Sequence, residues 1–391
     1  MRRRGEPLPP GFGTIWSCVA LDLLGFGIVL PILPVYARRF HASPVTATAL
    51  IAVFSAAQLV CSPLLGRLSD RIGRKPVLIL SLVGTAVGSL LTGLAGSVAV
   101  LYLGRLVDGA SGASVAAAQA AVSDVARPDQ RARLFGLLGA AFGLGFVGGP
   151  ALAGLAAAIG GPRLPFYLAA GLAGVNALTA VRRLPETRPR GASRLAGDRG
   201  STAAARRAAP LIALGFVALV AFSGFEATFS LFGKQRLHLT LAGTGLVFAL
   251  IGVSIAVVQV GLVHPVVNRI GEGGAIRVGL VANAMGLVVL ARVHGYGLLV
   301  PAMLLLTVGQ GLLAPSLAAA VVGRVGAARR GEILGWQQAA GSLARVVGPV
   351  LGGVLFQMVG VSAPYLAGAA LLIVTVVALG PRAESERLPA G

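Results

Sequence analysis

The chain has 391 residues, of which 56% are apolar and only 12% are charged, and its formal net charge is +20. An ordinary soluble domain is about a quarter charged, so this composition lacks the usual polar surface and excludes a soluble enzyme. The basic residues lie mainly between apolar runs, which indicates the inner face of a membrane and excludes a nucleic-acid binder.

Six apolar runs long enough to cross a bilayer precede a polar segment at residues 182–209, and six more follow it. A spanning helix needs about 20 apolar residues, and in hydrocarbon each backbone amide must be paired within its own helix. The runs lie near residues 12–36, 46–66, 76–96, 98–123, 134–159, 164–181, 210–232, 241–265, 275–292, 298–322, 333–359 and 362–379. The sequence therefore predicts an all-α integral membrane protein with twelve transmembrane helices.

These spans are expected to form two pseudo-symmetric six-helix bundles. The predicted boundaries are residues 1–181 for the N-terminal bundle, 182–209 for a cytoplasmic linker, and 210–391 for the C-terminal bundle with a short cytoplasmic tail. Lysine and arginine are concentrated in the tails and in every second loop. Because such residues stay on the cytoplasmic side, we expect a multi-pass protein of the cell inner membrane with both termini in the cytoplasm.

The two halves of the chain resemble one another. The sequence at residues 70–73 recurs at 268–271 with one change, and Gly149-Pro150 recurs as Gly348-Pro349 at nearly the same offset. Each half has six predicted spans, an even number, so the repeat is parallel and its axis lies along the membrane normal. A duplicated bundle of this kind suits rocking about a central site.

Cys18 and Cys61 lie within apolar runs, and they offer neither a disulfide framework nor the spacing of a metal site. No glycine-rich nucleotide-binding loop is present in the sequence. We therefore expect no cofactor, no metal and no direct use of ATP. No pair of a nucleophile and a base points to catalysis, so the chain is not predicted to be an enzyme.

The most specific motif lies in the loop expected between the second and third spans. Its candidate residues are Gly66, Asp70, Arg71, Gly73, Arg74 and Lys75. The two glycines allow a turn and close backbone approach, and the aspartate can accept hydrogen bonds near the helix ends. The three basic residues are expected to face the anionic leaflet.

This motif resembles the loop signature of the major facilitator superfamily, and the resemblance covers the chain from Asp22 to the last span. In that family the aspartate and the second arginine belong to a charge network that closes the cytoplasmic side. The resemblance therefore implies this role for Asp70 and Arg74. It adds Asp124, at the end of the fourth span, as a third member.

The fifth span resembles the antiporter motif of proton-coupled exporters in that superfamily, although Ala153 replaces the first glycine of the closing pair. The matching residues are Gly136, Gly145, Gly149, Pro150 and Gly154. Glycines let a neighbouring helix approach closely, and the proline favours a kink. The alternative interpretation is generic packing of small residues.

Two carboxylic acids lie well inside predicted spans, Asp22 in the first and Glu226 in the seventh. A charge in hydrocarbon is costly unless it is paired or hydrated, so each acid is a candidate functional group. In the family these spans line the central cavity. We expect both acids to couple protons and recognise cations, and the alternative is a structural role.

The fourth span carries Arg105 and, one turn later, Asp108, where the family usually has an amide. The spacing predicts an ion pair, which would serve either as a proton relay or as a structural pair. Arg345 lies in the eleventh span, and the sequence names no partner for it.

The sequence thus predicts a secondary transporter that exports small lipophilic compounds in exchange for protons through alternating access. It resembles the drug:proton antiporter branch of the superfamily. Its expected partners are a small-molecule substrate, protons and the lipid bilayer, and we expect a monomer. The alternatives are a transporter of a nutrient such as a sugar or organic acid, and a membrane receptor or scaffold that has lost transport. Sodium as the driving ion also stays open.

Overall fold

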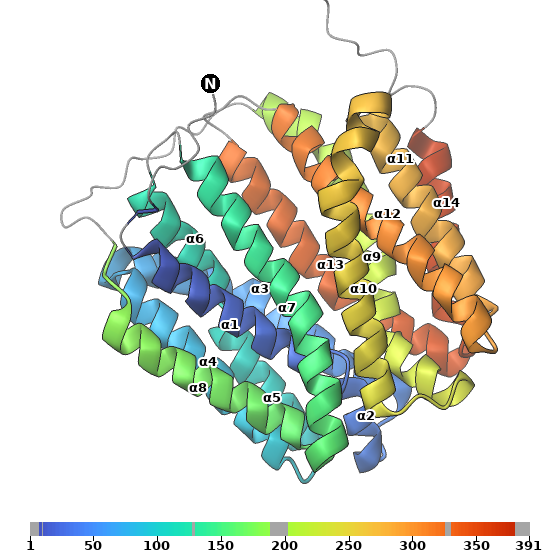
Figure 1. Ribbon diagram of the computed structural model, residues 1–391, viewed down its shortest axis with the longest axis horizontal. Coiled ribbons are helices and arrows are strands. Elements are labelled where there is room, and N and C mark those ends of the chain that lie inside the picture. Colours follow the sequence, from blue (N-terminus) through green and yellow to red (C-terminus); the bar gives the residue numbers. More distant parts are fainter. Residues whose placement is uncertain (1–7, 10, 127–129, 188–201, 325–329, 380–391) are drawn as a thin grey trace, which may run out of the picture. The chain divides into compact units, whose positions relative to one another are not determined.

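The computed structural model describes residues 8–9, 11–126, 130–187, 202–324 and 330–379. The helices group into two compact units (Figure 1). Unit 1 takes its described residues from Met1–Phe40, Val53–Gly197 and Leu241–Ala249, and unit 2 from His41–Ala52, Asp198–Thr240 and Leu250–Gly391. The boundaries expected for the bundles and the linker stay a prediction, and residues 188–201 of that linker lie outside the described residues.

Unit 1 contains most of the helices from the first half of the chain. They are α1 (Phe12–Val29), α2 (Leu33–Ala37), the 3-10 helix η1 (Arg38–Phe40), α4 (Arg74–Leu94), α5 (Val98–Ser111), α6 (Ser114–Val125), α7 (Arg131–Gly160) and α8 (Leu164–Arg183), with the C-terminal part of α3 (Pro44–Ile72). Helix α1 packs along α7 and α8, and α4 packs against α5 and α8 (Figure 1).

Unit 2 contains the helices of the second half. They are α9 (Thr202–Arg236), α11 (Val263–Ala291), α12 (Tyr296–Gly323), α13 (Arg330–Met358) and α14 (Ala363–Leu379), with most of α10 (Leu241–Gly261). Helix α9 packs against α13 and α14, and α11 packs against α12 and α14.

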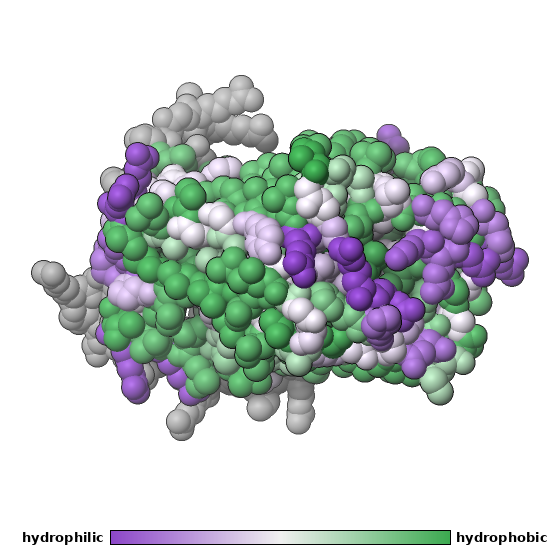
Figure 2. All heavy atoms as spheres, turned by 90° about the horizontal axis from the view of Figure 1, so that it is seen from below, coloured by the Kyte–Doolittle hydropathy of each residue, from purple (hydrophilic) through white to green (hydrophobic). Residues whose placement is uncertain are grey.

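Ten helices of the described chain are long and apolar enough to cross a membrane, and Ala363–Ala378 forms a shorter apolar helix. Many large apolar side chains are exposed, among them Val260 at 87% and Val377 at 73%. Figure 2 shows one face on which hydrophobic residues cover wide areas and hydrophilic residues gather in separate clusters. Such apolar area is suited to lipid, so the fold is that of an all-α, multi-pass membrane protein.

Two predicted spans are interrupted, which corrects their expected continuity. The first span ends its helix at Val29 and resumes at Leu33, because Pro31 has no N–H to donate. The fourth span is two helices, since α5 ends at Ser111 and α6 begins at Ser114. Between them Gly112 has a non-helical backbone (ψ 57°), which ends the helix without a proline.

The internal repeat is visible in the backbone. Gly73 between α3 and α4 has φ 109°, and Gly271 within α11 has φ 72°. Both values lie in the left-handed region, which a glycine adopts at little cost. The two glycines end the duplicated sequence that begins at Asp70 and Asn268, so each copy turns the chain at the same place.

Close packing between α1 and α7 depends on glycine. A Cβ atom at Gly27 would collide with the carbonyl oxygen of Gly145, and one at Gly149 would lie about as close to the backbone of Gly27. These positions therefore bring the two backbones closer than larger residues would allow. By contrast, a Cβ at Gly25, half a turn earlier on α1, would meet no atom within 4 Å.

We predict opposite effects of alanine at these two glycines of α1. Gly27→Ala should lower the unfolding temperature, because overpacking at a helix seam costs about 1–3 kcal/mol. Gly25→Ala should leave it unchanged or raise it, because alanine favours a helix by about 1 kcal/mol over glycine. Thermal unfolding of the purified, detergent-solubilised protein measures both. Equal destabilisation by the two variants would contradict the packing described.

Candidate functional site

A cluster of charges joins four segments of unit 1 at the junction of α3 and α4. The Arg74 guanidinium donates to Asp70 Oδ1 at 2.6 Å through Nη1 and to Asp124 Oδ2 at 2.9 Å through Nε. Nη1 also lies 3.3 Å from Ser69 Oγ. One arginine therefore connects the end of α3, the start of α4 and the end of α6, and it brings together the three charged residues named from the sequence.

Glu186, which follows α8, is a fourth member that the sequence analysis missed. Its carboxylate accepts hydrogen bonds from the backbone N–H groups of Arg74, at 2.8 Å, and Lys75, at 3.2 Å. An acid at this position satisfies the free donors at the start of α4 and interacts favourably with its dipole. A Cβ at Gly73 would collide with the Glu186 carboxylate, so the glycine is needed for this cap as well as for the turn. We name Asp70, Arg74, Asp124 and Glu186 the Arg74 cluster.

Two other residues of the loop motif lie outside this cluster. The expectation of close backbone approach at Gly66 is wrong, because the residue lies within α3 and a Cβ there would meet no atom of the described residues within 4 Å. Arg71 is exposed, and neither a hydrogen bond nor an ion pair links it to the part of the chain that is described.

The glycines of the predicted antiporter motif lie on α7, which runs unbroken through Pro150. A Cβ at Gly145 would meet the backbone of Leu23 in α1, and one at Gly154 would meet Ala242 in α10. Together with Gly149, which contacts Gly27 of α1, three of the motif's small residues thus pack against neighbouring helices. Gly136 lies in α7, but its surroundings lie outside what is described.

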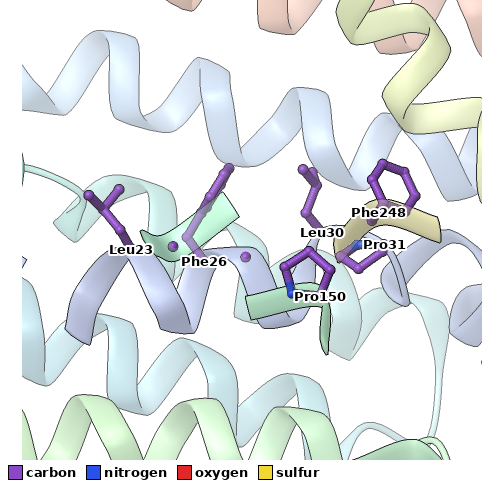
Figure 3. Close-up of a pocket in the computed structure, with 8 residues that line it drawn as sticks. Leu23, Phe26, Leu30, Pro31, Pro150 and Phe248 are labelled. Carbon is purple, nitrogen blue, oxygen red and sulfur yellow. The ribbon is translucent and has the colours of Figure 1, made fainter. Parts of the chain in front are cut away.

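A small apolar pocket lies where α1, α7 and α10 meet within unit 1. Its lining consists of Leu23, Phe26, Gly27, Leu30, Pro31, Gly145, Pro150 and Phe248. Figure 3 shows the Phe248 ring beside Pro31, at the break between α1 and α2, with Pro150 of α7 nearby. Two prolines therefore border this pocket: Pro31 in the break after α1 and Pro150 within α7.

Arg105 and Asp108 form the predicted ion pair on α5, with Nη1 and Oδ2 2.9 Å apart and side chains only 3% and 8% exposed. Arg105 Nη2 donates to Thr92 Oγ1 at 3.1 Å, and the Thr85 hydroxyl hydrogen-bonds to Asp108. This close fit requires Gly88 on α4, where a Cβ would collide with Asp108. The pair is thus built into the packing of α4 on α5.

Asp22 lies inside α1 and contacts the start of α6. The Ser114 hydroxyl donates to Asp22 Oδ2 at 2.5 Å, and Asp108 lies near enough for electrostatic repulsion. Within the described residues no arginine, lysine or histidine forms an ion pair with Asp22. Asp22 therefore has a neutral hydrogen-bond donor where Asp108 has a cation, and Ser114 is another residue that the sequence analysis missed.

Glu226 lies in α9 of unit 2, where it interacts electrostatically with Arg345 of α13. The structure thus supplies the partner for Arg345 that the sequence did not name. Beside Glu226, three phenylalanines of α9 are buried and pack on one another, and two of them, Phe225 and Phe232, also contact Tyr365, so these rings belong to the core. They are Phe225, Phe229 and Phe232.

The chain matches the family model of the Major Facilitator Superfamily over residues 15–296 and 262–390. The chain belongs to the major facilitator superfamily. Three similar proteins illustrate where in the superfamily it falls, two by sequence and one by structure.

The chain is 33% identical to the tetracycline resistance protein, class C, of Escherichia coli over 94% of this chain and 95% of that protein. It is 29% identical to multidrug resistance protein 2 of Bacillus subtilis (strain 168), over 93% of this chain and 92% of that protein. Among solved structures, the human organic anion transporter MFSD10 (TETRAN) matches with a TM-score of 0.70 and 25% identity, covering 94% of this chain and 98% of that chain. Similarity to superfamily members thus extends over nearly the whole chain.

We predict that Arg74 and Asp124 stabilise this superfamily member as a pair. Arg74→Gln and Asp124→Asn should each lower the unfolding temperature, because each removes a charge-assisted hydrogen bond. The double variant should lose less than the two single losses combined, since residues in one network are not additive. Thermal unfolding measures all three, and Arg71→Gln, in the same loop, is the control expected to change little. Additive losses would contradict a direct pair.

Proposed function

We propose that this chain exports small lipophilic, drug-like compounds in exchange for protons by alternating access. The support is its similarity to tetracycline and multidrug resistance proteins over most of their length. Alternating access is favoured by the duplicated helices and by the glycine seam between α1 and α7, where the two backbones are in close contact.

The single observation that carries the proposed coupling mechanism is that Asp22 has an uncharged hydrogen-bond partner. An ionised carboxylate in a spanning helix needs a partner of opposite charge, water or a proton, and among the described residues Asp22 bonds only to the Ser114 hydroxyl. We infer that Asp22 accepts a proton when no cationic group is near it, and releases the proton when one binds. Glu226 has the same role of recognising cations in unit 2.

The Arg105–Asp108 pair is placed to influence this step. Asp108 repels a negative charge on Asp22, whereas Arg105 already has Asp108 as its partner. We infer that the pair stays together beside Asp22, with the Asp108 carboxylate as the nearer charge, and does not itself exchange with substrate. The Arg74 cluster would close the cytoplasmic side of unit 1 while substrate leaves.

We further propose a cell inner membrane location with both termini in the cytoplasm and a monomeric transporter. The proposed bundles are residues 1–181 and 210–391, joined by the linker 182–209. Cytoplasmic placement of the Arg74 cluster follows from this orientation, since the α3–α4 junction lies two spans, an even number, apart from the N-terminus.

A drug-susceptibility panel tests the function. An efflux-deficient bacterial host expressing the full chain should tolerate at least one lipophilic compound better than the empty host, and a protonophore should abolish the difference. If resistance persists when the protonophore is present but is lost when sodium is removed, the driving ion is sodium. Unaltered susceptibility combined with uptake of a sugar or organic acid would favour a nutrient transporter.

We predict that Asp22→Asn uncouples export from the proton gradient. In proteoliposomes loaded with an exported compound, efflux driven by a pH gradient should fall at least about a hundredfold, the lower end of the loss typical for a proton-transferring group. Exchange of labelled for unlabelled compound should continue, because it needs no net proton movement. Glu272→Gln, which removes a carboxylate outside the proposed site, is the control. Undiminished pH-driven efflux in Asp22→Asn would contradict the proposal.

A further inference from the structure

Glu226 and Arg345 lie on two helices of unit 2 that are held together beside them. The Ser223 hydroxyl, one turn before Glu226, donates to the carbonyl oxygen of Ala344 at 3.1 Å. A Cβ at Gly348 would collide with Ser223, so the α9 and α13 backbones are in close contact here. Because the seam is fixed on both helices, the positions of the acid and the arginine along it are fixed too.

These two opposite charges influence one another but do not bond. In the described part of the chain, neither side chain makes a hydrogen bond or an ion pair, and both are half-buried. A guanidinium carries five N–H donors and a carboxylate accepts at two oxygens, so considerable hydrogen-bonding capacity is unused. Charges within spanning helices are costly when they lack partners, and this arrangement is therefore open to a polar ligand.

The other charges in spanning helices differ in this respect. Arg105 and Asp108 bond directly at 2.9 Å, and Asp22 accepts a hydrogen bond at 2.5 Å. Each of these three side chains bonds to another protein side chain, although Nε of Arg105 has no partner. Glu226 and Arg345 differ from them because, among the described residues, neither has a hydrogen bond or an ion pair at any of its polar atoms.

The fold itself does not require an arginine at this place. Arg345 lies one turn before Pro349 of the Gly-Pro pair on α13, and α7 carries the same pair at Gly149 and Pro150. The residues of α7 from 143 to 160 contain no ionisable side chain, and α7 still packs closely on α1. Helix packing at the Gly-Pro pair is therefore possible without a charge, which points to a ligand as the reason for Arg345.

We propose that Glu226 and Arg345 bind the two charged ends of a zwitterionic lipophilic substrate. Its cationic group would contact the Glu226 carboxylate, and its carboxylate would take a bidentate position on the Arg345 guanidinium. Phe222, one turn before Glu226, is only half-buried, so its ring is available to the apolar body of the ligand. This inference rests on the proposed export function and adds a substrate class to it.

Two dyes that differ in one group provide the test. Rhodamine 19 is a zwitterion with a free carboxylate, and rhodamine 6G is its ethyl ester and hence a cation with the same ring system. Fluorescence polarisation with the purified full chain in detergent gives the dissociation constant of each dye. Arg345→Gln should weaken rhodamine 19 binding at least about tenfold, the loss of about 1.4 kcal/mol expected for a charge-assisted bond, and rhodamine 6G less than about twofold.

Glu226→Gln should weaken both dyes, because both carry the cationic ring system. Arg292→Gln, an exposed arginine at the end of α11, is the control and should weaken neither. The proposal would be overturned if Arg345→Gln weakened the binding of both dyes equally or of neither dye. It would also be overturned if the wild-type protein did not bind rhodamine 19. Efflux of rhodamine 6G from proteoliposomes tests the export function separately, because that cation does not need Arg345.

Discussion

The cost of holding a charge in hydrocarbon is the constraint on which the rest of the molecule depends. The chain meets it in three different ways. Arg105 and Asp108 form an ion pair at 2.9 Å, Asp22 accepts a hydrogen bond from a hydroxyl, and Glu226 interacts electrostatically with Arg345. These differences separate one direct ion pair from two acids to which no cation is bonded in the described part of the chain. A transporter needs the second kind, because a group with a permanent partner cannot respond to a proton or a substrate.

Glycines determine how closely α1 and α7 pack beside these charged groups. Gly27, Gly145 and Gly149 let α1 and α7 touch along their backbones, so few side chains interlock across that seam. Helices packed in this way can shift relative to one another without repacking large residues. The seam borders the turn of α1 that carries Asp22, since Gly145 approaches the backbone of Leu23. Asp22 therefore lies beside the place where the two helices are closest.

The sequence predicted the features that depend on residues close to one another along the chain. The helical spans, the turn at Gly73 and the Arg105–Asp108 pair all follow from hydropathy or from a spacing of one turn. Two contacts between distant segments were missed, because Ser114 is 92 residues from Asp22 and Glu186 is 112 from Arg74, whereas Asp124 was named through the family resemblance. The close approach expected at Gly66 failed for a related reason, since composition shows that a glycine allows contact but not whether a neighbour is there.

The central claim is that Asp22 exchanges a proton for substrate. Measuring the protons released when substrate binds tests this claim most directly. Rhodamine 6G can be added to the purified, weakly buffered protein while a pH indicator dye records protons set free. The account predicts proton release from the wild-type chain and its loss in Asp22→Asn, with the dye still bound. Undiminished release from Asp22→Asn would contradict the account, because the exchangeable proton would then belong to another group.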